Sequence, residues 1–385
     1  MRVNSAADTA MNQPSSSFKD KLTKSGPRKL LALDGGGIRG VITLEILQQI
    51  ESTLQTKLGR GNDFVLAEYF DYIAGTSTGA IIAACLSLGM RTEDVLKFYL
   101  ESGPAMFAKS RFLLRLWHKY DSTPLAKMLQ KKFDADTTLG SEELQTLLML
   151  VLRNATTDSP WPICNNPDAH YNKPLTRPGC NLKFPLWQLV RASTAAPVYF
   201  PAEKIVIDGK EHLFVDGGVT MYNNPAFQLF LMATVEPYNL NWPTGEQNML
   251  VVSVGTGSGA NAQSKLKPSE MHLLYNASSI PSALMFAALN EQDFLCRVFG
   301  NCRVGGWLDR EVTDMIGKHG PAFPKLFTYL RYNADLTEEG LKTLPHIEPK
   351  HVQKMDSTKY IAELQEVGRV AADQVKITHF DGFLS

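Results

Sequence analysis

The stretch that decides the fold runs from Lys29 to Gly40 and reads KLLALDGGGIRG. Its first half is an apolar run that ends at a glycine cluster, which is typical of a buried strand. From Ile38 to Leu58 apolar residues return every three or four positions, the period of an amphipathic helix. A strand, a glycine turn and a helix in this order indicate an α/β sheet.

The same order of elements returns further along the chain. A predicted strand at Tyr69–Ala74 leads into the turn GTSTG at residues 75–79, and an apolar segment from Ala80 to Leu88 predicts a buried helix. The turn has the form G-x-S-x-G, which lifts a serine hydroxyl above a sheet. Ser77 is therefore the candidate nucleophile. Taken alone, Gly75 and Gly79 could equally serve only a tight turn.

The glycine cluster supplies candidate donors for an oxyanion hole. The backbone N–H groups of Gly35, Gly36 and Gly37 can face an anion with no Cβ in the way. Arg39 stands in the first turn of the predicted helix, where a cation opposes the helix dipole. It therefore needs either a nearby oxyanion or a structural carboxylate as its partner.

A dinucleotide site is the rival interpretation of this cluster, because residues 35–40 also fit G-x-G-x-x-G. That fingerprint expects an acidic residue at the end of the next strand to hold a ribose. Here the next strand ends at Gly75 and continues into the serine turn. The oxyanion-hole interpretation accounts for both turns, whereas the nucleotide interpretation accounts for one.

A third turn, DGG at residues 216–218, supplies the candidate base Asp216. It follows a predicted hairpin, Ile205–Ile207 and Leu213–Val215, around Asp208-Gly209, with a connection longer than two residues. By itself Asp216 would be an ordinary turn aspartate. Its pairing with Ser77, together with the lack of a histidine in any glycine turn after a strand, favours a Ser-Asp dyad, because a carboxylate in a dry site is a stronger base.

The rest of the chain predicts its organisation. We expect a flexible tail at 1–27, a catalytic domain at 28–265 and a mostly helical region at 266–385 that completes or regulates it. The stretch at about 103–185 is predicted to be an insertion beside or over the active-site face. It holds a strand at Leu147–Leu152 and a loop rich in Pro, Asn and Cys at 159–179. Residues 111–120 mix basic and apolar side chains, and packing inside the insertion is favoured over an interfacial helix. Met249–Val254 is a further buried strand.

Composition excludes several function classes. The 385 residues carry 39 basic and 39 acidic side chains, a balance that gives no reason to expect a basic surface for a nucleic-acid polymer. Five scattered cysteines make a poor disulfide framework and favour a reducing, cytoplasmic compartment. No metal-ligand pattern stands out, so neither a metal nor a cofactor is expected. The longest apolar stretch is too short to cross a bilayer, so any membrane contact is expected to be peripheral.

Taken together, the three turns resemble the patatin-like phospholipases, which are marked by D-G-G-G-x-R-G, G-x-S-x-G and D-G-[GA]. The segments ASTAAPVYFP at 192–201 and NNP at 223–225 are also similar to family sequence, and the resemblance covers about residues 28–260. It implies a three-layer α/β/α fold with a mostly parallel central sheet and a metal-independent lipid acyl hydrolase. In that family's scheme Ser77 attacks the ester and Asp216 takes its proton. Gly35, Gly36 and Gly37 hold the oxyanion, with Arg39 near it.

Within the family, the sequence around residues 186–201 is similar to that of bacterial members, some of which are anti-phage effectors activated by cyclic dinucleotides. This similarity suggests a cyclic dinucleotide activator, a homo-oligomer and action at the inner face of the cell membrane. Two alternatives stay open. One is a soluble carboxylesterase acting on small acyl esters. The other is a nucleotide-binding regulatory module that uses the loops at 35–40 and 255–259, with a vestigial hydrolase site.

Overall fold

The structure, a computed structural model, describes residues 17–106, 120–259, 273–309, 311–318 and 320–384. Its strands are β1 Arg28–Leu33, β2 Tyr72–Thr76, β3 Leu147–Asn154, β4 Ser159–Cys164, β5 Glu203–Ile207, β6 Lys210–Asp216, β7 Met249–Val254, β8 Asn301–Val304 and β9 Thr328–Tyr332. They form one sheet in the order β5-β6-β3-β2-β1-β7-β9-β8, with β4 paired to β3. The run from β3 to β8 is parallel, and β4, β5 and β6 are antiparallel. The predicted mostly parallel sheet is confirmed.

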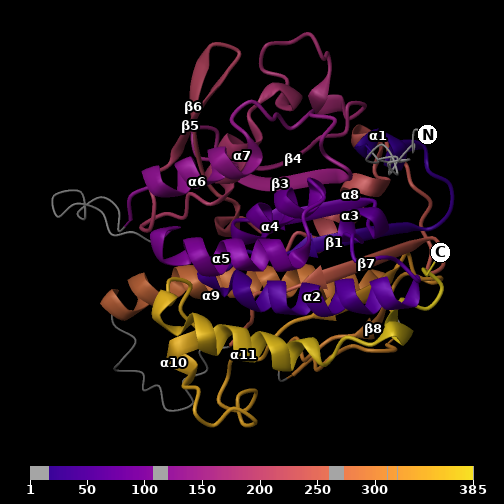
Figure 1. Cartoon of the computed structure of the whole chain (residues 1–385), viewed down its shortest axis with the longest axis vertical. Coiled ribbons are helices and arrows are strands. Elements are labelled where there is room, and N and C mark those ends of the chain that lie inside the picture. The colour runs from indigo at the N-terminus through magenta and orange to yellow at the C-terminus, as the bar shows by residue number, and fades with distance from the viewer. Residues whose placement is uncertain (1–16, 107–119, 260–272, 310, 319, 385) are drawn as a thin grey trace, which may run out of the picture.

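Helices cover both faces of the sheet (Figure 1). Their bounds are α1 Phe18–Thr23, α2 Gly40–Lys57, α3 Leu66–Tyr69, α4 Thr78–Ser87, α5 Thr92–Met106, α6 Thr123–Phe133, α7 Leu186–Ser193, α8 Ala226–Thr234, α9 Leu273–Phe299, α10 Pro349–Val352 and α11 Ile361–Ala372. On one face α2, α4 and α7 contact the sheet, with α5, α6 and α11 packed against them, while α8 and α9 contact the other face. The predicted three-layer α/β/α architecture is therefore confirmed.

The middle of the sheet is the core of the molecule. Every residue of β1, β2, β7 and β9 is buried, as parallel strands covered on both faces require. All ten residues of α4 are buried as well, so the predicted buried helix is confirmed. The strand before it begins at Tyr72 rather than Tyr69, because residues 66–69 form the short helix α3.

The N-terminal segment differs from the expected tail over its described part. Residues 18–23 form α1, which Ser17 and Asp20 begin with a reciprocal capping box. Phe18 is buried and its N–H donates to the Leu144 carbonyl at 2.8 Å. These contacts connect the segment to the rest of the fold. Residues 1–16 lie outside the described residues.

The stretch expected to be an insertion contributes to the core. β3 pairs with β2, β4 and β6 in the sheet, so residues 147–154 belong to the fold itself. β4 occupies the start of the predicted loop at 159–179 and pairs with β3 in spite of two prolines. The segment at 111–120 falls almost wholly outside the described residues.

Two further differences concern strands. The region 266–385, expected to be mostly helical, also supplies β8 and β9 to the sheet. The hairpin connection is shorter than predicted, because Ile207 pairs with Lys210 and leaves only Asp208 and Gly209 between them. Both have positive φ, 47° and 77°, which suits a two-residue turn that follows the twist of its strands.

Candidate active site

The serine turn connects β2 to α4 in a strained conformation. Ser77 has φ 55° and ψ −120°, a region that a residue with a side chain rarely adopts. A Cβ on Gly75 would overlap the Gly79 carbonyl, and a Cβ on Gly79 would overlap the Leu33 carbonyl. Both glycines are therefore required by close packing of the turn against β1 and α4.

The structure brings Ser77 and Asp216 together. The Ser77 hydroxyl donates to Asp216 Oδ2 at 2.5 Å. β4 occupies one edge of β3, and β2 and β6 pair with successive parts of the other edge. Thr76 lies opposite Val151 and Asp216 lies opposite Leu152, so Ser77 and Asp216 meet where β2 and β6 end. The second carboxylate oxygen accepts the Gly218 N–H at 2.6 Å. This geometry suits a nucleophile and its base, the roles predicted for this pair.

Burial sets the proton affinity of the candidate base. Asp216 is only 4% exposed. This burial raises its pKa to about 6, against the opposing effects of the hydrogen bonds from Ser77 and Gly218 and of the positive charge of Arg191. At neutral pH the carboxylate is still ionised, and it is a stronger base than an ordinary aspartate.

The glycine turn lies beside the serine. An ideal Cβ built on Gly35 would be 3.2 Å from Ser77 Cβ. The Gly35 N–H already donates to the Asn223 carbonyl at 3.1 Å, and the Gly35 carbonyl accepts from Thr256 Oγ1 at 3.0 Å. The amides of Gly36 and Gly37 donate to no group in the described part of the chain. Of the three predicted oxyanion donors, these two are the ones free to face a substrate.

Arg39 joins the glycine turn to the C-terminal region. Its guanidinium donates to the Gly36 carbonyl at 3.4 Å and to the Gln353 carbonyl at 3.2 Å. Burial lowers its pKa to about 10, although the nearby Asp34 and Tyr199 oppose this effect, so Arg39 stays protonated at neutral pH. In this structure its hydrogen bonds go to carbonyls rather than to the carboxylate partner considered from the sequence.

Two residues that support the site were not predicted from the sequence. Ser193 Oγ accepts the Ser77 N–H at 2.9 Å and donates to the Val151 carbonyl at 2.6 Å, so it fixes the serine turn against β3. The side-chain oxygen of Asn223 lies against both Gly35 and Gly218. Ser193 lies in the segment 192–201 and Asn223 in the segment 223–225. The sequence pointed to these segments only through their similarity to family sequence.

The second glycine loop is used internally. The N–H groups of Gly255, Gly257 and Ser258 donate to Tyr332, Asn333 and Ala334 at 2.8–2.9 Å. These amides therefore bind β9 and the chain after it rather than facing outward. That arrangement weighs against this loop as a phosphate cradle.

The described residues offer neither a metal site nor a membrane span. No group of three or more His, Cys, Asp or Glu side chains is placed to hold a metal ion within the described ranges. Across the same ranges, no helix combines the length and the apolar character needed to cross a bilayer. All five cysteines are buried and free of disulfides.

Comparison with known proteins places these features in a family. The family model described as patatin-like phospholipase matches residues 31–230, which include all three turns. The chain is 28% identical to Patatin-T5 of Solanum tuberosum over 72% of its length and 77% of that protein. It is 31% identical to Patatin-2-Kuras 4 of Solanum tuberosum, and the match spans 60% of the chain and 63% of that protein. It is also 31% identical to Patatin-17 of Solanum cardiophyllum over 60% of each.

Among solved structures, the chain has a distant likeness to VipD from Legionella pneumophila. The TM-score is 0.39 with 14% sequence identity, and the match covers 89% of this chain and 67% of that one. This level of similarity carries no weight for function.

Proposed function

Because this chain belongs to the patatin-like phospholipase family of lipid acyl hydrolases, we propose that it cleaves phospholipid acyl esters through an acyl-enzyme on Ser77. The observation that carries the proposal is the 2.5 Å hydrogen bond from Ser77 Oγ to Asp216 Oδ2 at a strained strand-to-helix turn. A serine hydroxyl is a weak nucleophile until a base takes its proton, and this contact supports Asp216 as that base.

The proposed reaction has two halves. In the first, Asp216 accepts the hydroxyl proton while Ser77 Oγ attacks the ester carbonyl. The resulting oxyanion is stabilised by the Gly36 and Gly37 amides and by the N-terminal end of α4. The ester bond breaks, and the lysophospholipid alcohol leaves with the proton from Asp216. In the second half, a water molecule gives a proton to Asp216 and attacks the acyl-enzyme. The bond to Ser77 Oγ breaks, Asp216 returns the proton to Ser77 Oγ, and the fatty acid leaves.

Gly35 and Arg39 take supporting places in this proposal. The Gly35 amide can reach an oxyanion only if its bond to the Asn223 carbonyl breaks, so its contribution is to hold the turn in place. Arg39 adds positive charge next to the Gly36 carbonyl, on the side of the turn that faces the C-terminal region.

The proposed partner is a phospholipid surface that the protein contacts peripherally, at the inner face of the cell membrane. Three apolar side chains close in sequence to the site support this contact, since Val198, Val219 and Met221 are 76%, 39% and 45% exposed. Val219 and Met221 follow Asp216 by three and five residues, and Val198 follows Ala195, whose carbonyl accepts the Asp216 N–H at 3.0 Å, by three residues. Exposed apolar side chains beside a site for lipid esters suit entry into a lipid surface.

Activation by a cyclic dinucleotide, assembly into a homo-oligomer and a role in anti-phage defence rest only on the resemblance to bacterial members, and we propose them on that basis. A soluble carboxylesterase would share the same site. The nucleotide-binding module is less favoured, because the amides of Gly255, Gly257, Ser258 and Gly35 are already bonded within the protein.

Fatty-acid release from phospholipid vesicles tests the proposal. Wild type and Ser77→Ala are compared in the presence of a chelator, each with and without a panel of cyclic dinucleotides. Fatty-acid release by wild type but not by Ser77→Ala, in the absence of nucleotide, indicates a constitutive lipase. Release only with one nucleotide indicates a gated enzyme. Absence of release from vesicles, with turnover of short-chain esters, indicates the soluble esterase and contradicts the proposed substrate.

A further inference from the structure

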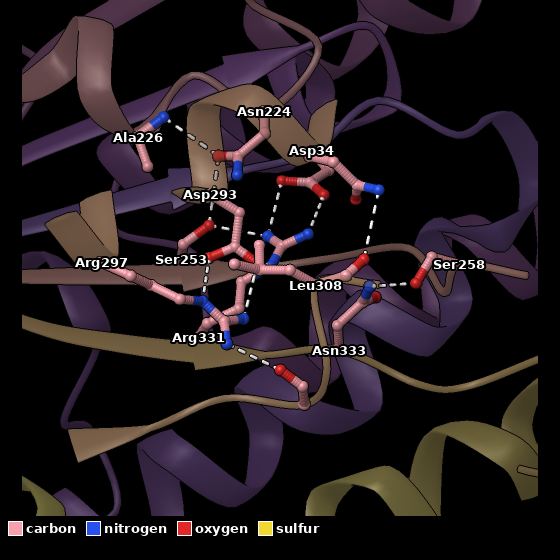
Figure 2. A network of polar contacts seen from close by, with 12 residues as sticks. Asp34, Asn224, Ala226, Ser253, Ser258, Asp293, Arg297, Leu308, Arg331 and Asn333 are labelled. Carbon is pink, nitrogen blue, oxygen red and sulfur yellow. Dashed lines mark hydrogen bonds and ion pairs between the residues drawn. The ribbon is translucent and has the colours of Figure 1, made fainter. Parts of the chain in front are cut away.

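Four buried charged side chains, Asp34, Arg331, Asp293 and Arg297, form a network in which positive and negative charges alternate (Figure 2). Each is at most 6% exposed, and two negative charges balance two positive ones. They come from distant parts of the chain. Asp34 directly follows β1, Arg331 lies in β9, and Asp293 and Arg297 lie on α9. The C-terminal third, in which the sequence showed no motif, therefore reaches the first residue of the DGGGIRG motif.

The ion pair next to the glycine turn, between Arg331 and Asp34, is bidentate. Arg331 Nη1 lies 2.9 Å from Asp34 Oδ1, and Nη2 lies 2.6 Å from Oδ2. Nη1 also donates to Ser253 Oγ at 2.7 Å. Ser253 is the register partner of Arg331 on β7, the strand that separates β9 from β1. The arginine side chain thus passes across β7 to reach Asp34.

The other half of the network serves a different part of the molecule. Arg297 donates to both carboxylate oxygens of Asp293 at 2.8 and 2.7 Å. It also donates to the carbonyls of Gly306 and Asp314 at 2.7 and 2.5 Å, in the loop after β8. The two halves meet where Asp293 Oδ2 lies 3.8 Å from Arg331 Nε. Arg297 is as buried as Arg331, yet the hydrogen bonds of its side chain go to α9 and that loop.

Asp34 is connected to the candidate oxyanion donors directly through the backbone. Asp34 immediately precedes Gly35, and its own N–H donates to the Val254 carbonyl at 3.1 Å. The turn that follows is closely packed, because a Cβ on Gly36 would overlap Thr256 and one on Gly37 would overlap the Met355 carbonyl. A planar guanidinium holding both oxygens of Asp34 fixes the direction in which the chain leaves β1, as a lysine ammonium cannot.

We propose that Arg331 is a positioning residue for the candidate oxyanion hole. By holding Asp34, it aims the Gly36 and Gly37 amides at the reacting carbonyl. The inference rests on the proposed function. It also makes the C-terminal third of the chain part of the active site rather than a separate regulatory element.

The test compares Arg331→Lys with the matched control Arg297→Lys in the full-length protein. Both keep the positive charge and lose the fork geometry, and both sites are equally buried. Thermal unfolding is measured first, and kcat and KM on a soluble 4-nitrophenyl ester are then measured well below each melting temperature. We expect Arg331→Lys to lower kcat by about 10- to 100-fold with KM within about threefold of wild type, since a small shift of the donors weakens transition-state binding most. Arg297→Lys should lower the melting temperature and keep kcat within about twofold.

Three outcomes would overturn the inference: a folded Arg331→Lys enzyme with wild-type kcat, an equal loss of kcat in Arg297→Lys, or a wild type that hydrolyses no ester. The last also removes the proposed function, whereas the first two leave wild type active. If Arg331→Lys does not fold, the double variant Asp34→Asn/Arg331→Gln replaces the ion pair with two amides and keeps the network neutral. The same fall in kcat is expected there, and a folded double variant with wild-type kcat would contradict the proposal.

Discussion

Replacing Asp216 with asparagine should abolish turnover and at the same time stabilise the protein at neutral pH. Asparagine keeps the size of the side chain and can still accept the Gly218 N–H, but it cannot take the Ser77 proton. It also removes a negative charge that burial makes unfavourable. Activity and stability should therefore change in opposite directions, as expected where a functional group is held in an unfavourable environment.

The size of the stability gain follows from the pKa. The Asp216 carboxyl has a pKa of about 6 in the folded protein, against 3.8 for an ordinary aspartate. Because the pKa is higher in the folded than in the unfolded protein, the protonated carboxyl favours folding. This contribution to the free energy of unfolding is fully present below pH 3.8 and is lost as the pH rises through 6. The loss amounts to about 3 kcal/mol at pH 8 and about 1.6 kcal/mol at pH 5. Because the asparagine variant does not suffer this loss, it should be the more stable protein by these amounts.

Thermal unfolding of wild type and Asp216→Asn between pH 5 and pH 8 measures the difference. For 385 residues a gain of about 3 kcal/mol corresponds to a rise of about 4 °C in melting temperature at pH 8, falling to about half of that at pH 5. Ser77→Ala, which leaves the carboxylate in place, is the control for loss of activity alone. A variant that is less stable than wild type at pH 8, or a difference that does not change with pH, would refute the reasoning.

Four further measurements address the site. Ser77→Ala should reduce ester turnover to background with the fold intact, and residual turnover near the wild-type rate in a folded variant would exclude it as the nucleophile. Gly36→Ala should lower kcat by about 100-fold with a small change in KM, because its Cβ would displace Thr256 and the donor turn; Gly306→Ala, which meets nothing within 4 Å, is the control, and an equal kcat in both would contradict the donor role. Ser193→Ala leaves the partly buried Ser77 N–H without its acceptor and should lower kcat by about 10-fold, measured beside the melting temperature. The pH profile of kcat/KM should fall about tenfold per pH unit below pH 6 as Asp216 becomes protonated, and a flat profile down to pH 5 would argue against this base.

Local signals in the sequence predicted the parts of the fold that depend on neighbours in the chain. β1 and β7 are mostly apolar, and their predicted bounds differ from the structure by at most one residue. The turns at Gly35 and Ser77 follow β1 and β2, which are parallel neighbours, and for this reason the proximity of these two turns could be expected. Asp216 ends β6, which is antiparallel to β3, so its approach to Ser77 did not follow from the same rule.

Contacts between distant segments could not be predicted in this way. β9 reads TYLRY, and its arginine is buried only because Asp34 and Asp293 are there to pair with it. β4 contains two prolines, which normally exclude a strand, and it forms because it pairs only along one edge, with β3. The Gly35 amide cannot be recognised as occupied until the fold brings the Asn223 carbonyl to it.

The most direct test of the central claim is to trap the acyl-enzyme. Wild type and Asp216→Asn are mixed with a phospholipid of defined acyl chains, quenched in acid within the first turnovers, digested and mapped by mass spectrometry. We predict that the wild-type peptide containing Ser77 gains the mass of one acyl group, and that this adduct is absent from Asp216→Asn. Fatty-acid release by wild type without any adduct on Ser77, or with the acyl group on another residue, would contradict the account.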